Sequence, residues 1–236
     1  METNLLGRRG SKLSFCLLAA ILAYLILVSL IFWFDPGLDL LVSSLFWKAG
    51  SGFIYLHMAW AIWARHILNF LVWLCVGLSF LGLIFLNKKY KTYKKYCLYL
   101  LLCFALAPGL LVNTVLKNHW GQPRPIEIQL FGGHMTYQKD WVISKQCPTN
   151  CSFVCGDCSA AFILMAFVPL VFSRRKKILL ASLIITGSVF IGLIRLGQGG
   201  HFLSDVLLAY GLDGLVIFLV YQWILCRGGP KCPPKF

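Results

Sequence analysis

Three short stretches of the chain carry side chains that together could bind a phosphate group and attack it. They are residues 117–125, 155–159 and 195–205, and each lies at the edge of an apolar segment. Charge beside bilayer-length apolar segments is costly, so it usually serves a function. The stretches supply three cations, a histidine and carboxylates, which are the groups needed to neutralise a phosphate and displace one of its oxygens.

His201 and Asp205 are four residues apart at the start of the last apolar segment. Positions i and i+4 share one face of a helix, so the Asp205 carboxylate could bond one imidazole nitrogen and fix the tautomer. The other nitrogen would then be free as a base or nucleophile. A histidine and an aspartate at the start of a helix are also common without catalysis, so the pair is suggestive only together with other residues.

The candidate phosphate-binding cations are Lys117, Arg124 and Arg195. Pro125 restricts Arg124 to an extended backbone, which could hold its guanidinium ready for a bidentate phosphate contact. In the topology described below, Arg195 is the only arginine beside an outer end of a span, and the glycines that follow it allow close approach to a ligand. Snorkelling at a span end is the alternative role for Lys117 and Arg124.

The stretch 155–159 opens the fourth apolar segment. The free N–H groups of a first helical turn form an anion site, and Gly156 would let the backbone come close to the anion. Taken alone, the segment favours a simple N-cap role for Asp157 or Ser159.

The composition indicates an integral membrane protein. The 236 residues are 59% hydrophobic and 13% charged, with a mean hydropathy of +0.77, whereas about 25% of residues are charged in soluble domains. We predict one all-α, polytopic domain over residues 1–236. Its six transmembrane helices, each near the ~20 residues that cross a bilayer, are predicted at residues 13–34, 66–86, 96–116, 159–173, 178–194 and 206–226.

Membrane topology explains the formal net charge of +14 better than nucleic-acid binding does. Basic residues gather within residues 8–12, 88–95, 174–177 and 227–235. Six spans place all four clusters on one side, which the positive-inside rule identifies as the cytoplasm, with both termini. The three phosphate stretches then face the extracytoplasmic side.

Residues 38–58 are open to two interpretations. Their apolar residues could form a helix on the outer membrane surface, with Trp47 and Trp60 at the interface. An ordered loop with an aromatic anchor fits equally well.

The order Lys117-x6-Arg124-Pro, then residues 154–157, then Arg195-x5-His201-x3-Asp205 resembles the type 2 phosphatidic acid phosphatase superfamily. The resemblance spans residues 117–205. It implies a six-helix, metal-independent membrane phosphatase that needs no cofactor.

The resemblance also implies a role for each site residue. Lys117, Arg124 and Arg195 would hold the phosphate oxygens. His201 would attack phosphorus and become phosphohistidine, and Asp205 would orient it.

Two departures from the family pattern concern the second stretch. Cys155 stands where the family has serine, and Asp157 stands where it has the histidine that protonates the leaving group. We therefore predict Asp157 as the general acid, acting only in the substrate complex, with His119 as the next candidate.

Residues 151–162 most resemble the lipid A 4′-phosphatase branch, in which an acidic residue can replace that histidine. The expected partner is a phosphorylated lipid, most of all lipid A, in a Gram-negative inner membrane with the site facing the periplasm. An undecaprenyl-diphosphate or phosphatidylglycerophosphate phosphatase is the alternative within the class. A transporter or channel, or an inactive lipid-binding relative, is the alternative outside it.

Four cysteines, Cys147, Cys151, Cys155 and Cys158, lie in the long loop before the fourth span. In an oxidising periplasm a disulfide is favoured over a zinc site. We predict a Cys147–Cys151 bridge, because the other two cysteines lie inside the family motif.

Overall fold

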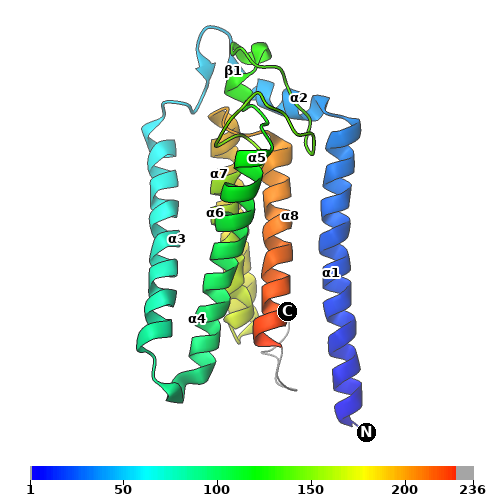
Figure 1. Cartoon of the computed structure of the whole chain (residues 1–236), viewed down its shortest axis with the longest axis vertical. Helices are drawn as coiled ribbons and strands as arrows, with labels where there is room; N and C mark the ends of the chain where they lie inside the picture. The colour runs from blue at the N-terminus through cyan, green and yellow to red at the C-terminus, as the bar shows by residue number, and fades with distance from the viewer. Residues whose placement is uncertain (1, 227–236) are drawn as a thin grey trace.

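A computed structural model describes residues 2–226 of the chain, with side chains from Ser14 onward except Lys88. The fold is all-α, as predicted, with a bundle of membrane helices capped at one end (Figure 1). The helices that form the bundle are α1 (Glu2–Phe34), α3 (Ala59–Phe85), α4 (Lys91–Phe104), the π-helix η2 (Ala105–Leu116), α6 (Gly156–Phe162), η5 (Ile163–Leu170), α7 (Arg174–Gly197), α8 (Leu203–Val220) and η6 (Tyr221–Leu225).

Shorter elements connect these helices and cover one end of the bundle. They are α2 (Gly37–Leu45), the antiparallel strands β1 (Trp47–Lys48) and β2 (Gly52–Phe53), η1 (Lys88–Tyr90), α5 (Lys117–His119), η3 (Pro125–Glu127) and η4 (Gln129–Phe131). We call the end that carries α2, the hairpin and residues 120–155 the capped end.

Within residues 2–226, five helices are long and apolar enough to cross a membrane, and a sixth apolar helix, Gly156–Leu170, is shorter. Continuous helix joins α4, η2 and α5 into one rod over Lys91–His119. The second predicted span began too late, since α3 starts at Ala59 rather than at residue 66. The reason is that Arg65 interrupts the apolar run without interrupting the helix.

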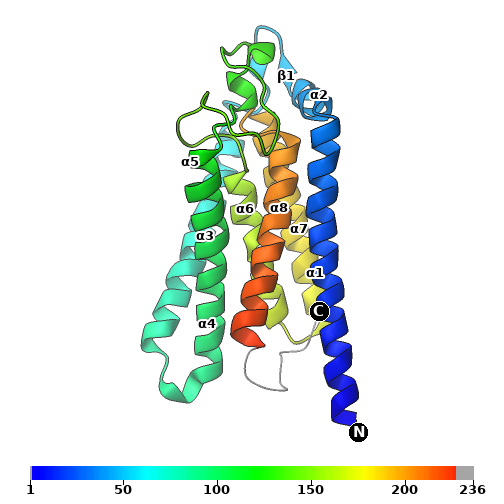
Figure 2. The same ribbon diagram turned by 45° about the vertical axis from the view of Figure 1, so that its right-hand side comes forward.

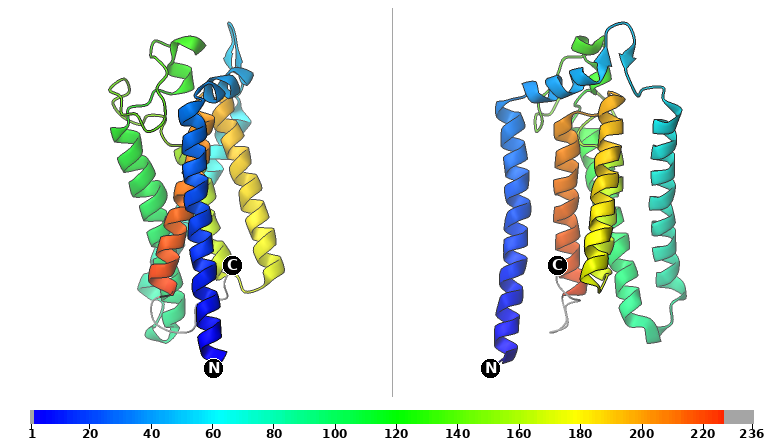
Figure 3. Two further views of the ribbon diagram at one scale, coloured as in Figure 1. Left: turned by 90° about the vertical axis from the view of Figure 1, so that its right-hand side faces the viewer. Right: turned by 180° about the vertical axis from the view of Figure 1, so that it is seen from behind.

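The central helix of the bundle is α8. It is the most buried of the long helices, whereas α1 and α3 are the least buried and stand on opposite sides of it (Figure 3). Side chains such as Phe70 and Leu78 on α3 are exposed and apolar, as expected of a surface that faces lipid. The site residues at the start of α8 are therefore shielded by helices on several sides.

The segment 38–58 combines both interpretations of its sequence. Helix α2 is followed by the β1–β2 hairpin, and both lie across the capped end (Figure 2). Asp39 on α2 is fully buried and accepts hydrogen bonds from the backbone N–H and the hydroxyl of Ser204, at 2.9 and 2.6 Å. This segment is therefore fixed to the first turn of α8.

The connections that carry Lys88–Lys95 and Arg174–Lys177 lie at the end opposite the cap, together with the start of α1 (Figure 1). The basic cluster at residues 227–235 lies outside the described residues. The two described basic connections thus lie at one end of the bundle, and all three phosphate stretches lie at the other. A chain that crosses the membrane six times requires this arrangement.

Reporter fusions test this topology. A reporter fused after Lys235 and one inserted after Asn87 should both behave as cytoplasmic, whereas one inserted after His134 should behave as extracytoplasmic, because positive loops stay inside. Extracytoplasmic signal from either of the first two fusions would contradict the predicted orientation.

Candidate active site

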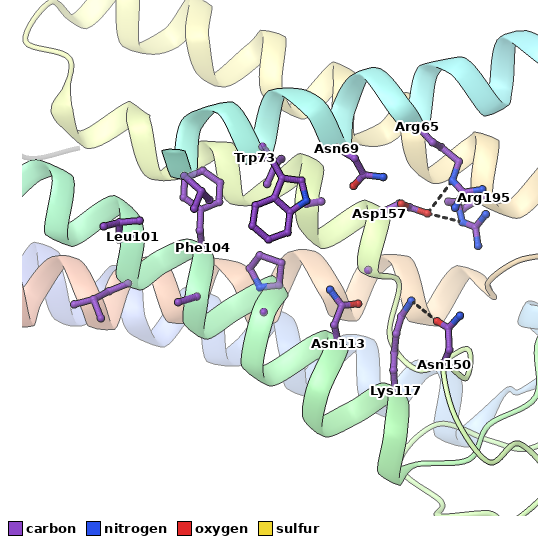
Figure 4. A pocket seen from close by; sticks show the side chains of 18 of the residues that line it. Arg65, Asn69, Trp73, Leu101, Phe104, Asn113, Lys117, Asn150, Asp157 and Arg195 are labelled. Atoms are coloured by element: carbon purple, nitrogen blue, oxygen red, sulfur yellow. Dashed lines mark hydrogen bonds and ion pairs between the residues drawn. The ribbon is translucent and has the colours of Figure 1, made fainter. Parts of the chain in front are cut away.

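A cavity of about 660 Å³ runs between α3 and the α4–η2 rod toward the first turn of α6 (Figure 4). Its lining changes along its length. Charged side chains line the part near the capped end, and apolar side chains such as Trp73, Leu101 and Phe104 line the part deeper in the bundle. One end of the cavity is therefore polar and the other is apolar, which matches the polar headgroup and the apolar chains of a lipid.

Lys117 and Arg124 meet at Asn150 in the polar part of the cavity. The Lys117 ammonium lies 3.5 Å from Asn150 Oδ1, and the Arg124 guanidinium donates to the Asn150 carbonyl at 2.7 Å. Lys117 is 9% exposed although it carries charge. Asn150, which the sequence analysis missed, holds both cations toward the same space.

Arg195 is nearly buried at the end of α7 and forms an ion pair with Asp157, with 3.1 Å between Nε and Oδ2. The Nη1 group of the same guanidinium donates to Gln198 Oε1 at 2.7 Å. A Cβ on Gly200 would clash with the Arg195 guanidinium, so a larger residue there would displace this side chain. The glycine-rich turn thus lets Arg195 lie against the backbone next to His201.

Arg65 is a fourth cation that the sequence analysis missed. Its Nε donates to Asp157 Oδ2 at 3.0 Å, and it also reaches Gln198 Oε1 at 3.3 Å. The expectation that Arg195 is the only arginine at an outer span end is therefore wrong. The available signal was an arginine seven residues into a helix that is otherwise apolar.

The first turn of α6 differs from the N-cap interpretation of its sequence. Cys155 is the N-cap, and its Sγ accepts from the Cys158 N–H at 3.2 Å. Asp157 pairs with two arginines, and Ser159 donates to Asp213 at 2.8 Å.

Gly156 at the same turn allows close approach of neighbouring side chains. A Cβ there would lie 2.7 Å from Asn113 Oδ1 and 3.0 Å from Lys117 Nζ. The structure thus brings Gly156 into the polar part of the cavity, as the phosphate-binding role requires.

His201 is fully buried, with Nδ1 2.7 Å from the Ser152 carbonyl oxygen. A carbonyl only accepts, so Nδ1 carries the proton and Nε2 keeps its lone pair. Within residues 2–226, Nε2 has no hydrogen-bond partner. Burial, then the charges of Arg195, Lys117 and Arg124, hold the His201 pKa well below its usual value. The imidazole is therefore neutral at pH 7.

Asp205 is connected to His201 through Ser152 rather than by a direct hydrogen bond. Its Oδ2 lies 3.6 Å from His201 Nδ1, too far for a hydrogen bond. It accepts instead from the Ser152 hydroxyl at 2.5 Å and from the Phe202 N–H at 2.9 Å. The expected direct contact fails because the Ser152 carbonyl already occupies Nδ1.

Neither His119 nor the fully buried His201 is among the residues that line the cavity. His201 lies behind the lining, close enough for the charges of Arg195, Lys117 and Arg124 to act on it. His119 is exposed, and its Nδ1 lies 2.9 Å from the Val115 carbonyl one turn earlier.

The pattern of the PAP2 superfamily matches residues 98–228, more than half of the chain. The chain belongs to the PAP2 superfamily. It is a membrane-embedded phosphatase, a phosphoric monoester hydrolase.

Curated relatives and a solved structure resemble this PAP2 phosphatase. The lipid A 4′-phosphatase of Francisella tularensis subsp. novicida (strain U112) is 35% identical over 199 residues, which cover 80% of this chain and 85% of that protein. The lipid A 4′-phosphatase of Rhizobium leguminosarum is 40% identical over 116 residues, 48% of each chain. A crystal structure of a transmembrane PAP2-type phosphatidylglycerolphosphate phosphatase from Bacillus subtilis has a TM-score of 0.56 at 18% identity, covering 87% of this chain and 94% of that one.

Two disulfides stiffen the loop of this PAP2 phosphatase around the site. Cys147 is bridged to Cys151, the pair that the sequence favoured. Cys155 is also bridged to Cys158, which the sequence analysis left unpaired. Their Cα atoms lie 5.2 Å apart across the first turn of α6, within the normal range for a bridge.

A buried acid cluster fixes the start of α8. The Ser204 hydroxyl lies 2.6 Å from Asp39 Oδ2 and 3.0 Å from Asp140 Oδ1. The Ser204 hydroxyl has one proton and can donate it to only one of these two carboxyl groups. The second carboxyl group must then be protonated and donate to the hydroxyl oxygen, or it makes no hydrogen bond with Ser204. Asp39 also accepts from Ser204 N–H and the Tyr137 hydroxyl. Asp140 accepts from Gln122 Nε2 at Oδ1, and its Oδ2 has no partner within residues 2–226. Asp140 is therefore the better site for a proton.

Burial raises the pKa of Asp39 to about 6, and burial and the charge of Asp39 raise the pKa of Asp140 to about 7. Both values exceed those of the unfolded chain. Between about pH 4 and 7 the native state therefore binds more protons than the unfolded state, and the free energy of unfolding falls as pH rises.

Asparagine substitutions should separate the two acids. Asp140→Asn keeps the Oδ1 acceptor and imitates the protonated form, so its melting temperature in detergent should fall less than that of wild type between pH 5 and 8. Asp39→Asn replaces one of the two carboxylate oxygens that accept hydrogen bonds from Ser204 and Tyr137. Its free energy of unfolding should be lower by about 1–3 kcal/mol over the whole pH range. Parallel pH curves for Asp140→Asn and wild type would contradict this assignment.

Proposed function

We propose that this protein removes the 4′-phosphate of lipid A at the periplasmic face of a Gram-negative inner membrane. The main support for the proposal is that one continuous cavity contains both a cluster of four cations and apolar faces of membrane helices. The four cations are Arg65, Lys117, Arg124 and Arg195. The names of the curated relatives support lipid A as the lipid. The basic connections at the opposite end of the bundle support a periplasmic site.

The cations bind the phosphate before any bond is broken. Lys117, Arg124 and Arg195 contact its oxygens, and charge-assisted bonds of this kind are the strongest available to a phosphate. The acyl chains lie along Trp73 and Phe104. The sugar oxygen that leaves then points toward Asp157.

In the first step, the Nε2 lone pair of His201 attacks phosphorus, and the phosphorus–oxygen bond to the sugar breaks with its electrons on oxygen. Asp157 gives a proton to that oxygen. The proton on His201 Nδ1 stays in place and donates a hydrogen bond to the Ser152 carbonyl oxygen. This hydrogen bond stabilises the positive charge of the phosphohistidine. The cations balance the charge on the transferring group.

In the second step, Asp157 accepts a proton from water, and the water oxygen attacks phosphorus. The phosphorus–nitrogen bond breaks, inorganic phosphate leaves and neutral His201 returns. Asp157 thus acts first as acid and then as base.

The substrate is tested with purified protein and lipid A in mixed micelles, with the products read by mass spectrometry. We expect loss of one phosphate, assigned to the 4′ position by fragmentation, in the presence of EDTA. His201→Ala should lower the rate at least a hundredfold, since loss of a covalent nucleophile removes the main chemical route.

The same assay distinguishes the alternative functions. Faster turnover of phosphatidylglycerophosphate or undecaprenyl diphosphate than of lipid A would contradict the proposed substrate. Phosphate release that survives in His201→Ala would contradict the proposed nucleophile.

Asp157 is tested through leaving groups that differ in their need for a proton. Asp157→Asn should lose most activity on lipid A while it still binds the lipid, and Asp157→His should keep some activity.

An activated aryl phosphate provides the control, since its leaving group departs without a proton. In the first turnover, Asp157→Asn should release the aryl alcohol within about threefold of the wild-type rate, whereas later turnovers should slow because the second step has lost its base. Equal losses in first-turnover release from lipid A and from the aryl phosphate would show that Asp157 holds the arginines rather than donating a proton. Wild-type turnover of lipid A by Asp157→Asn would also rule out the acid role.

A further inference from the structure

The α3 wall of the cavity carries three side chains of different character in a row. Arg65, Asn69 and Trp73 are spaced by four residues, so they share one face of the helix. All three line the cavity, in this order from the capped end inward (Figure 4). The wall thus presents a cation, then an amide, then an aromatic ring.

The opposite wall repeats the same order. Lys117, Asn113 and, further along the rod, Leu101 line it from the capped end inward (Figure 4). Asn113 lies beside the start of α6, because a Cβ on Gly156 would approach its Oδ1. A cation therefore faces a cation, an amide faces an amide, and apolar side chains face one another below.

The two amides lack partners in the described part of the chain. The side chains of Asn69 and Asn113 are both exposed to the cavity, and among residues 14–226 neither donates or accepts a side-chain hydrogen bond. Unpaired polar groups on membrane helices are costly and usually serve a function. An amide can donate and accept at once, so these two groups suit a ligand that offers both kinds of partner.

We propose that Asn69 and Asn113 form a polar subsite for the hydroxyl and amide groups on the ring of an acylated amino sugar that carries the phosphate. A phosphate held by the cations places its neighbouring groups about one helical turn, ~5 Å, further along the cavity, at the level of the amides. The alcohol half of phosphatidic acid carries only ester oxygens there, which accept but do not donate. The amide pair thus selects acylated sugar phosphates over diacylglycerol phosphates.

This inference rests on the proposed function, because it names the groups on the leaving alcohol of the same substrate. It adds a selectivity that the phosphate-binding residues do not provide, since those residues contact only the phosphate shared by all candidate lipids. A site built to bond such groups discriminates against a ligand that lacks them.

The test compares kcat/KM for lipid A and for phosphatidic acid in the same mixed micelles. Asn69→Ala with Asn113→Ala should lower the value for lipid A by about 10- to 100-fold, as expected for two lost hydrogen bonds, and should change that for phosphatidic acid by less than about threefold. Thr114→Val is the matched control, because Thr114 adjoins Asn113 but does not line the cavity, and it should alter neither value.

An unchanged ratio of the two values, whether both fall or neither falls, would overturn the inference. If the double variant does not fold, each single variant is judged by the same ratio. If phosphatidic acid is too slow to measure, the activated aryl phosphate supplies the reference rate. Failure of the proposed function is a separate result, seen in wild type as a preference for phosphatidic acid over lipid A.

Discussion

An excess of positive charge, carried by two buried and two half-buried side chains, controls the organisation of this protein. Arg65, Lys117, Arg124 and Arg195 converge on one end of a cavity in a membrane-helix bundle, where the carboxylate available to them is Asp157. Cations in a site of low dielectric repel one another and lack the hydration that water would give them. A bound phosphate restores the balance, so the charge that makes the empty site costly is also what makes it select a phosphate.

The fold holds this cluster together through buried polar contacts around the start of α8. The Ser152 carbonyl fixes the His201 tautomer, and the Ser152 hydroxyl connects it to Asp205. Asp39 on α2 and Asp140 in the long loop meet at Ser204. Helix α2 and the long loop are thereby tied to the turn that carries the proposed nucleophile. Such networks are specific because each unpaired member is costly.

The sequence was informative where function depends on local order. The order and spacing of Lys117, Arg124, Arg195 and His201 predicted that their side chains lie close together, because each follows or precedes an apolar span. The apolar lengths gave the helices to within several residues. The structure also contains the predicted Cys147–Cys151 bridge.

The contributions that the sequence did not reveal come from contacts between distant segments. Arg65 looked like a residue outside the membrane span, since a charge ended the apolar run, and only the packing of α3 beside α6 brings it to Asp157. Ser152 and Asn150 lie in an irregular loop whose path no periodicity predicts. The buried role of Asp39 depends on α2 lying across the start of α8.

Trapping a phosphoryl group on His201 between the two steps is the decisive experiment for the proposed mechanism. Wild-type protein would be mixed with lipid A, quenched in alkali, which preserves phosphohistidine, and digested for mass spectrometry. We expect a phosphoryl group on the peptide that contains His201, present within the first turnover and absent in His201→Ala. Rapid release of phosphate with no phosphoryl group on His201 at any time would contradict the proposed mechanism.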